Sequence, residues 1–209
     1  MSYTGTQVMV MAQRYLVDVD DGAYSDDMLD YLNEGSRRFA TETQCCQAIQ
    51  ACTFTAQSIG FSTIADLIAN ADELLFVSKV EAPLNTVSQF LPKAPLSEMR
   101  KTLATGVVIP TRYTTFAKTI TLDTDADQVL SLPTNIYCSY VPEDIVAGDD
   151  ILIPAQWVQA LVKYIVYCAR VADRDSGLAN GAFADYEAIR LQAAMVVTAQ
   201  TEGIPSQGA

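Results

Sequence analysis

Apolar residues near the N-terminus recur at the spacing of an α-helix. A first helix is predicted over residues 7–17, because Val8, Met11 and Tyr15 fall on one face. A second helix is predicted to follow Ser25, whose hydroxyl can accept hydrogen bonds from the free amides of a first helical turn. The residues expected to face inward on this second helix are Met28, Leu32, Gly35, Ser36 and Phe39.

Gly35 stands out because it lies inside the second predicted helix. Glycine in a helix interior costs up to about 1 kcal/mol relative to alanine. A close crossing with another helix would explain its presence, since glycine lets two backbones approach.

From Cys45 onwards the apolar pattern changes to a period of two. Residues 46–56 alternate in this way, which predicts a strand. Pro83, Pro92 and Pro95 indicate loops and sheet edges, because proline cannot donate a backbone hydrogen bond. Further strands are predicted at residues 74–80, 113–116, 119–122 and 136–141.

The helical pattern returns at Pro154, a residue that suits the first position of a helix. Val158, Leu161 and Ile165 begin its apolar stripe, and residues 173–181 are predicted to form the turn that follows. The residues expected to face inward on a last helix are Ala182, Tyr186, Ile189, Ala193 and Val196.

These patterns predict an α+β fold. Residues 1–43 and 151–200 are expected to supply two helical pairs that form one four-helix bundle. Residues 44–150 are expected to form an inserted β-rich domain, and residues 201–209 a flexible C-terminal arm.

The charge balance is acidic, with a formal net charge of −12. Residues 1–43 alone hold eight acids and three bases, and the densest basic clusters are only Arg37-Arg38 and Arg100-Lys101. A protein that grips DNA shows a basic face, so this chain is expected to repel nucleic acid. Hydrophobic residues make up 50% and charged residues 18%, which fits either a protein that hides surface against partners or an apolar globular domain.

The five cysteines are predicted to be reduced, apolar residues, because their number is odd and no C-x-x-C spacing occurs. Reduced cysteines fit synthesis in a cytoplasm. The N-terminus lacks the basic region of a signal peptide, and residues 151–172 contain too many polar residues for a membrane span.

Motifs for catalysis are missing from the sequence. It contains no histidine, no P-loop and no nucleotide-binding glycine motif, so no catalytic residue, metal ligand or cofactor is predicted. Asp123, Asp125 and Asp127 imitate the start of a calcium loop, but Gln128 replaces the essential glycine and Thr134 the bidentate glutamate. A solvated hairpin tip is therefore the preferred interpretation of these aspartates.

The stretch YSDDMLDYLNEGSRRFA at residues 24–40 resembles the second helix of tailed-bacteriophage head-to-tail adaptor (connector) proteins. Later pieces follow in the same order as in that family. They are the strand at residues 75–80, the segment 137–142 that ends in proline, the helix around residues 160–164, and the acidic exit at 173–175. Their order and spacing carry the resemblance, because each piece alone is a packing or capping motif.

The resemblance implies a structural virion protein of the phage neck, made in the host bacterial cytoplasm, and not an enzyme. It implies a ring of twelve copies that binds the portal protein on one side and a downstream neck or tail protein on the other. Genomic DNA would pass through the ring without specific binding, and no membrane is involved. The early acid excess makes these residues candidates for the channel lining: Asp18, Asp20, Asp21, Asp26 and Asp30.

The C-terminal segment has two interpretations. Gly203 and Pro205 prevent it from continuing a helix, so it is either a frayed tail or an arm that becomes ordered on the portal. The resemblance favours an arm, since adaptors of this kind tend to use chain ends for docking. The candidate docking residues are Thr201, Glu202, Gly203, Ile204, Pro205 and Ser206.

Two alternatives remain open at the level of the sequence. One is another phage neck or tail component, such as a stopper or a tail-tube protein, although these are usually dominated by β-structure. The other is a small enzyme or ligand-binding domain that uses carboxylates, which would require a deep pocket with facing acids.

Overall fold

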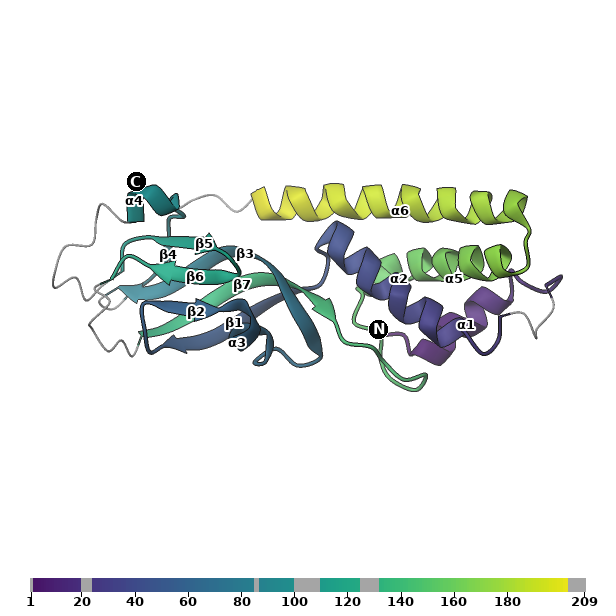
Figure 1. Ribbon diagram of the computed structural model, residues 1–209, viewed down its shortest axis with the longest axis horizontal. Coiled ribbons are helices and arrows are strands. Elements are labelled where there is room, and N and C mark those ends of the chain that lie inside the picture. Colours follow the sequence, from purple (N-terminus) through teal and green to yellow (C-terminus); the bar gives the residue numbers. More distant parts are fainter. Residues whose placement is uncertain (1, 20–23, 85–86, 100–109, 125–131, 203–209) are drawn as a thin grey trace. The chain divides into compact units, whose positions relative to one another are not determined.

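The computed structural model describes residues 2–19, 24–84, 87–99, 110–124 and 132–202 (Figure 1). The chain divides into two compact units. Met1–Cys46 and Pro142–Ile204 form the helical unit, and Gln47–Val141 forms the sheet unit. Helices and antiparallel sheets are both present, so the predicted α+β class is confirmed.

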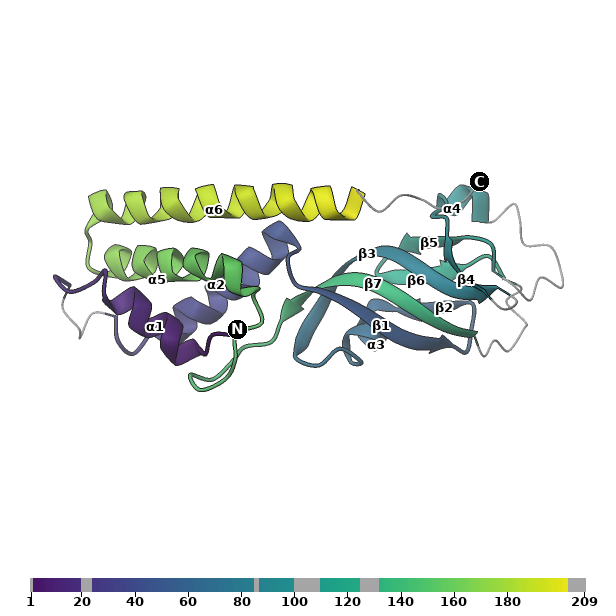
Figure 2. The same ribbon diagram turned by 180° about the vertical axis from the view of Figure 1, so that it is seen from behind.

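The helical unit is organised around α5 (Val158–Ala172). This helix contacts α1 (Gly5–Gln13), α2 (Met28–Thr43) and α6 (Ser176–Glu202), as Figures 1 and 2 show from opposite sides. A short 3₁₀ helix, η2 (Ala155–Trp157), leads into α5. The side chains at the centre of the unit are fully buried and include Val8, Leu32, Phe39, Leu161, Ile165 and Tyr186.

Helix α1 begins with a reciprocal cap that the sequence pattern did not reveal. The Thr4 hydroxyl accepts a hydrogen bond from the Gln7 amide at 3.3 Å, and the Gln7 side chain accepts one from the Thr4 amide at 3.1 Å. Two of the helix's free amides are satisfied in this way, which sets its first residue.

The predicted cap at Ser25 is wrong. Helix α2 begins at Met28, its N-cap residue is Asp27, and Asp27 makes no side-chain capping bond. Ser25 instead lies in the preceding turn, where the Asp27 amide donates to the Tyr24 carbonyl at 3.2 Å. Because this turn occupies the backbone groups that Ser25 would have capped, the helix starts later. The predicted turn at residues 173–181 is also shorter than expected, because α6 already begins at Ser176.

The sheet unit contains a four-stranded and a three-stranded antiparallel sheet. The order in the first is β1 (Gln47–Phe54), β7 (Leu132–Pro142), β3 (Ala71–Leu84) and β4 (Val87–Leu91). The second contains β2 (Ser58–Gly60), β6 (Thr119–Leu122) and β5 (Tyr113–Phe116). Two short helices, α3 (Phe61–Ala65) and α4 (Leu96–Met99), lie between strands.

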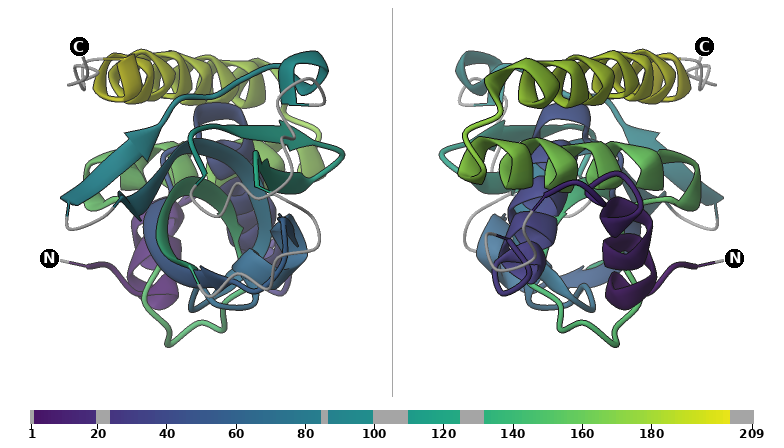
Figure 3. Two further views of the ribbon diagram at one scale, coloured as in Figure 1. Left: turned by 90° about the vertical axis from the view of Figure 1, so that its left-hand side faces the viewer. Right: turned by 90° about the vertical axis from the view of Figure 1, so that its right-hand side faces the viewer.

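The strands of this unit curl around one core, which is visible end-on in Figure 3. Its side chains come from both sheets and from α3, and they include Phe54, Ile64, Leu74, Val80, Ile120 and Ile136. All five predicted strands are present, and β3 is longer than predicted at both ends.

Asp123 is not part of a solvated hairpin tip, which corrects that expectation. Its carboxylate is buried and accepts hydrogen bonds from the Thr111 amide at 2.7 Å, the Thr111 hydroxyl at 2.6 Å and the Arg112 amide at 2.8 Å. These three hydrogen bonds replace the contacts with water that the carboxylate loses on burial. Through them, Asp123 holds residues 111–112 beside β6. Asp125 and Asp127 lie outside the described residues.

Candidate functional site

The contact between α2 and α5 is unusually close at Gly35. A Cβ atom placed on Gly35 would lie 2.8 Å from Cδ1 and 3.2 Å from Cγ of Tyr164. Real Cβ atoms do not approach ring carbons so closely, so only glycine allows the ring to rest on α2. A close contact is therefore present at Gly35, and it is the Tyr164 side chain of α5 that approaches the α2 backbone.

Tyr164 belongs to an aromatic cluster between α2, α5 and α6. Its ring centroid lies 5.3 Å from that of Tyr186 and 6.0 Å from that of Tyr167, and Phe183 stacks 5.9 Å from Tyr186. The Arg38 guanidinium lies 5.5 to 5.8 Å from the rings of Tyr164, Phe183 and Tyr186. This arrangement ties the three helices together through cation–π as well as apolar contacts.

A polar chain continues from this cluster. The Tyr164 hydroxyl donates to the Glu34 carboxylate at 2.8 Å, and the Arg38 side chain donates to Glu42 at 3.0 Å. Burial and the bond to Glu34 raise the pKa of Tyr164 well above its ordinary value. A hydroxyl that stays protonated at neutral pH suits a structural hydrogen bond, not proton transfer.

The hydroxyl of Tyr186 is a different case. It is buried and has no hydrogen-bond partner among the described residues. A buried polar atom without a partner costs about 1 to 3 kcal/mol. Tyr186→Phe is therefore expected to leave the unfolding free energy unchanged or to raise it by up to about 1 kcal/mol. Chemical denaturation measures this effect, with Tyr164→Phe as the comparison. Tyr164→Phe should be destabilising, and an equal loss in both variants would contradict the prediction.

Arg170 connects the last turn of α5 to the segment that follows α1. It is 6% exposed, and its guanidinium donates to the two Asp18 carboxylate oxygens at 3.0 and 2.6 Å and to the Tyr15 carbonyl at 3.0 Å. The bidentate pair fastens the segment after α1 to the last turn of α5. The hydrogen bond from Arg170 holds the pKa of Asp18 below its ordinary value.

This pair predicts a pH-dependent contribution to stability. Because the pKa of Asp18 is lowered in the folded state, its contribution is present above the unfolded pKa and is lost as the pH falls through the folded pKa. Asp18→Asn should be less stable than the wild type at pH 7, and the difference should shrink below a pH of about 4. Denaturation midpoints at several pH values test this, with the exposed Asp26→Asn as the control. A difference that is constant between pH 7 and pH 3 would rule it out.

The segment 142–150 is fixed to α2 and to the start of α1. Asn33 donates to the Ile145 carbonyl at 3.2 Å and accepts from the Ile145 amide at 3.1 Å. Arg37 pairs with Asp144 at 2.8 Å, and the Thr6 hydroxyl donates to the Ala147 carbonyl at 2.7 Å. Residues 31–40 therefore carry a dense set of contacts within the helical unit.

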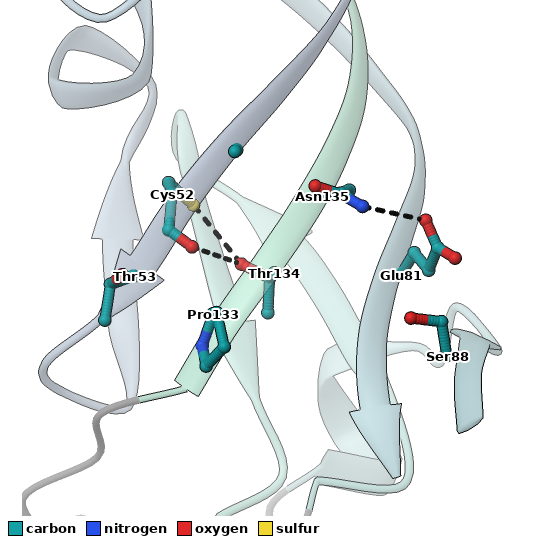
Figure 4. Close-up of a pocket in the computed structure, with 8 residues that line it drawn as sticks. Cys52, Thr53, Glu81, Ser88, Pro133, Thr134 and Asn135 are labelled. Atoms are coloured by element: carbon teal, nitrogen blue, oxygen red, sulfur yellow. Dashed lines mark hydrogen bonds between the residues drawn. The ribbon is translucent and has the colours of Figure 1, made fainter. Parts of the chain in front are cut away.

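Figure 4 shows a pocket in the sheet unit beside Cys52, Glu81, Thr134 and Asn135. The Cys52 sulfur lies 3.3 Å from the Thr134 hydroxyl, and burial raises the pKa of Cys52. Glu81 accepts hydrogen bonds from Asn135 at 3.1 Å and from Tyr137 at 3.2 Å. A nucleophilic cysteine needs an activating base, whereas the partner of this thiol is a hydroxyl. The lining of this pocket includes one carboxylate, Glu81, so the pocket does not present the facing acids that the carboxylate-using alternative requires.

Neither metal ligands nor a membrane helix can be assigned. Within the described ranges, no group of three histidine, cysteine, aspartate or glutamate side chains is placed to hold a metal ion. Among the helices of those ranges, none is both long and apolar enough to cross a membrane.

Comparison with protein families identifies the family of the chain. The model of the family described as SU10 adaptor protein matches residues 3–204. The chain belongs to this family. Curated protein sequences give no match. The matched range includes both the helical unit and the sheet unit.

Membership in the SU10 adaptor protein family confirms the resemblance to phage head-to-tail adaptors. The family implies a structural protein of the virion neck that assembles with portal and tail proteins. The segment that first indicated the resemblance, residues 24–40, covers most of α2, and its Asn33, Gly35 and Arg38 make the contacts described above.

The candidate channel acids lie in different environments. Asp18 is engaged by Arg170, whereas Asp26 and Asp30 are exposed in the turn before α2 and in its first turn. Asp20 and Asp21 lie outside the described residues.

Two of the candidate docking residues lie in a helix, which corrects the expectation of a flexible arm at these positions. Thr201 and Glu202 are the last residues of α6. The other candidates, Gly203, Ile204, Pro205 and Ser206, lie outside the described residues.

Sequence reasoning missed Arg170 and Asn33 as organising residues. Both make contacts with residues more than a hundred positions away in the chain. The available signal for Arg170 was a cation inside the apolar run of α5, since a buried arginine requires a partner.

Proposed function

We propose that this SU10 adaptor protein forms a closed ring of twelve copies beneath the portal, joins the capsid to the tail and encloses part of the DNA channel. The family match over residues 3–204 carries the proposal. Portal vertices are cyclic, so adjacent adaptor copies must contact each other through two different surfaces. The helical unit, as the predicted four-helix bundle, would supply those surfaces. No observation favours the stopper, tail-tube or enzyme alternatives over this function.

The acid excess of the helical unit supports a channel that does not retain DNA. Its two segments contain seventeen acidic and seven basic residues, whereas the sheet unit is nearly balanced, with eight acids and six bases. Acidic groups repel the phosphate backbone, so DNA can slide past them. The exposed Asp26 and Asp30 are the described candidates for this lining. Asp20 and Asp21 are further candidates and lie outside the described residues.

Electron microscopy of the purified protein with portal rings tests the function. The proposal expects one closed adaptor ring per portal, with the protein contacting one end of it. A protein that leaves portal rings bare at micromolar concentration, or that forms only a twofold dimer, would contradict the proposal.

The C-terminal residues should contribute to docking without contributing to folding. Deleting residues 203–209 removes Ile204, the arm's apolar anchor, and leaves α6 complete to Glu202. The thermal midpoint should stay within about 2 °C, because the removed segment is short and mostly polar. Affinity for portal rings should fall at least about tenfold. Sedimentation with portal rings measures the affinity. Equal binding by truncated and full-length protein would place docking elsewhere on the chain.

A further inference from the structure

Helix α6 has apolar side chains on two opposite faces. Its inward face contains the buried residues Ala179, Ala182, Tyr186, Ala193 and Val197. Its outward face carries a second row, which we call the α6 stripe: the apolar Ala184, Ala188, Leu191 and Met195, followed by Thr198. These five residues are exposed and are spaced alternately four and three apart, as in a helix that packs lengthwise against a partner. Met195 is 71% exposed and Leu191 is 49% exposed, although both are large apolar side chains.

Helix α1 carries a second apolar surface, a shallow groove on its outward side. Val8 and Ala12 are buried against the helical unit, and Val10 is 43% exposed on the other side. We call this surface the α1 groove; its lining includes Tyr3, Thr6, Gln7, Val10, Met11 and Arg14.

The two surfaces lie on opposite sides of α5. Helix α5 contacts both α1 and α6, and these helices flank it from different directions in Figures 1, 2 and 3. Two different surfaces on opposite sides of one unit produce head-to-tail association, in which each copy uses one surface for each neighbour. Such association closes into a ring when the rotation between neighbours divides a full turn evenly.

Charge identifies a second copy of this chain as the occupant. The helical unit has ten more acids than bases, so two copies repel each other over most of their surface. Residues 2–13 contain no charged side chain, and residues 188–201, which hold four of the five stripe residues, contain only Arg190. Beside Ala184, the remaining stripe residue, Asp185 is paired with Lys163 at 2.8 Å within the same copy. Arg190 is paired with Glu42 at 3.2 Å and Glu187 at 2.7 Å within the same copy. These two stretches are therefore where like-charged copies can meet without bringing carboxylates together.

We infer that the α6 stripe of one copy packs into the α1 groove of the next, with Met195 and Leu191 as anchors and Val10 at the centre of the groove. This inference rests on the proposed ring and assigns the surfaces that close it. The small residues Ala184 and Ala188 allow the helices to approach closely at one end of the contact, and the two large side chains fill the groove at the other.

The test uses two charge insertions and their mixture. Met195→Glu blocks the α6 stripe, and Val10→Glu blocks the α1 groove; both sites are exposed, so folding should be preserved. Each variant alone should lose ring formation, with self-association weakened at least tenfold. A mixture of the two should form only dimers, because the intact stripe of the Val10→Glu copy fits the intact groove of the Met195→Glu copy and both remaining surfaces are blocked. Leu67→Glu is the matched control, since Leu67 is 51% exposed in the sheet unit.

Analytical ultracentrifugation measures the assembly of the protein alone, and electron microscopy measures it on portal rings. If the wild type forms rings, and both variants form rings as well as Leu67→Glu does, the assigned surfaces are wrong but the proposed ring is not contradicted. Variants that dimerise on their own would show that each surface binds its own kind, which also overturns the inference. If the wild type forms no ring either alone or on portals, the proposed function itself fails.

Discussion

Replacing Phe39 with alanine is expected to lower the unfolding free energy of the helical unit by about 3 to 5 kcal/mol. Phe39 is fully buried on α2, and its ring meets that of Tyr186 edge-on at a centroid distance of 6.2 Å. The substitution removes the largest apolar side chain of α2 and leaves a cavity that Tyr186, held between α2 and α5, cannot fill by a small movement. Both the lost burial and the cavity contribute to the cost.

Trp157 allows this loss to be assigned to the helical unit. It is the one tryptophan of the chain, it is 7% exposed, and it lies immediately before α5. Its fluorescence during denaturation should report the unfolding of this unit. Phe116→Ala is the control, because Phe116 is 62% exposed on β5 and its removal should change stability by less than about 0.5 kcal/mol. Equal midpoints for Phe39→Ala and the wild type would show that Phe39 does not hold α2 in place.

The features predicted correctly from the sequence depend on local periodicity. The alternation from Cys46 to Ala56 marks β1, because a period of two places one face of a strand in the core. The apolar spacing of Leu32, Gly35 and Phe39 marks the buried face of α2 for the same kind of reason. Gly35 gave information beyond periodicity. Glycine destabilises the interior of a helix, so a compensating contact was expected at this position, and the Tyr164 ring provides it.

The contacts that the sequence did not reveal depend on how distant segments of the chain pack together. Arg170 meets Asp18 across 152 positions, and Asn33 meets Ile145 across 112. No local pattern links such partners, because their proximity follows from how α1, α2 and α5 pack. Ser25 illustrates the opposite error: its residue type favours a cap, but the turn at Tyr24–Asp27 competes for the same backbone groups.

The exposure of the apolar residues of the α6 stripe is not evident from the sequence alone. The predicted inward face of α6 correctly includes Ala182, Tyr186 and Ala193, whereas Ile189 and Val196 are only half-buried. Helical spacing puts Leu191 and Met195 on the other face, but only the folded unit shows that this face is exposed. Because they are apolar yet exposed, they are candidates for contact with a neighbour.

The substitution of glycine by alanine is expected to have opposite effects at Gly35 and Gly181. Both lie within helices, where alanine gains up to about 1 kcal/mol over glycine. At Gly181 no atom lies within 4 Å of the added Cβ, so Gly181→Ala should stabilise the helical unit by about 0.5 to 1 kcal/mol. At Gly35 the added Cβ would lie 2.8 Å from the Tyr164 ring, which is itself packed against Tyr167 and Tyr186. Overpacking costs about 1 to 3 kcal/mol, so Gly35→Ala should destabilise by up to about 2 kcal/mol despite the gain in helix propensity.

A double-mutant cycle with Tyr164→Ala identifies the cause of the Gly35 effect. Tyr164→Ala alone removes a buried ring and should be destabilising by about 3 to 5 kcal/mol. Once the ring is gone, the clash is gone as well, so adding Gly35→Ala to Tyr164→Ala should become neutral or stabilising, as it is at Gly181. The coupling between the two positions should therefore be at least about 1 kcal/mol, measured by Trp157 fluorescence in denaturant. If Gly35→Ala stabilises the wild type as much as Gly181→Ala does, the ring of Tyr164 does not rest on α2, and the close crossing that organises the aromatic cluster is absent in solution.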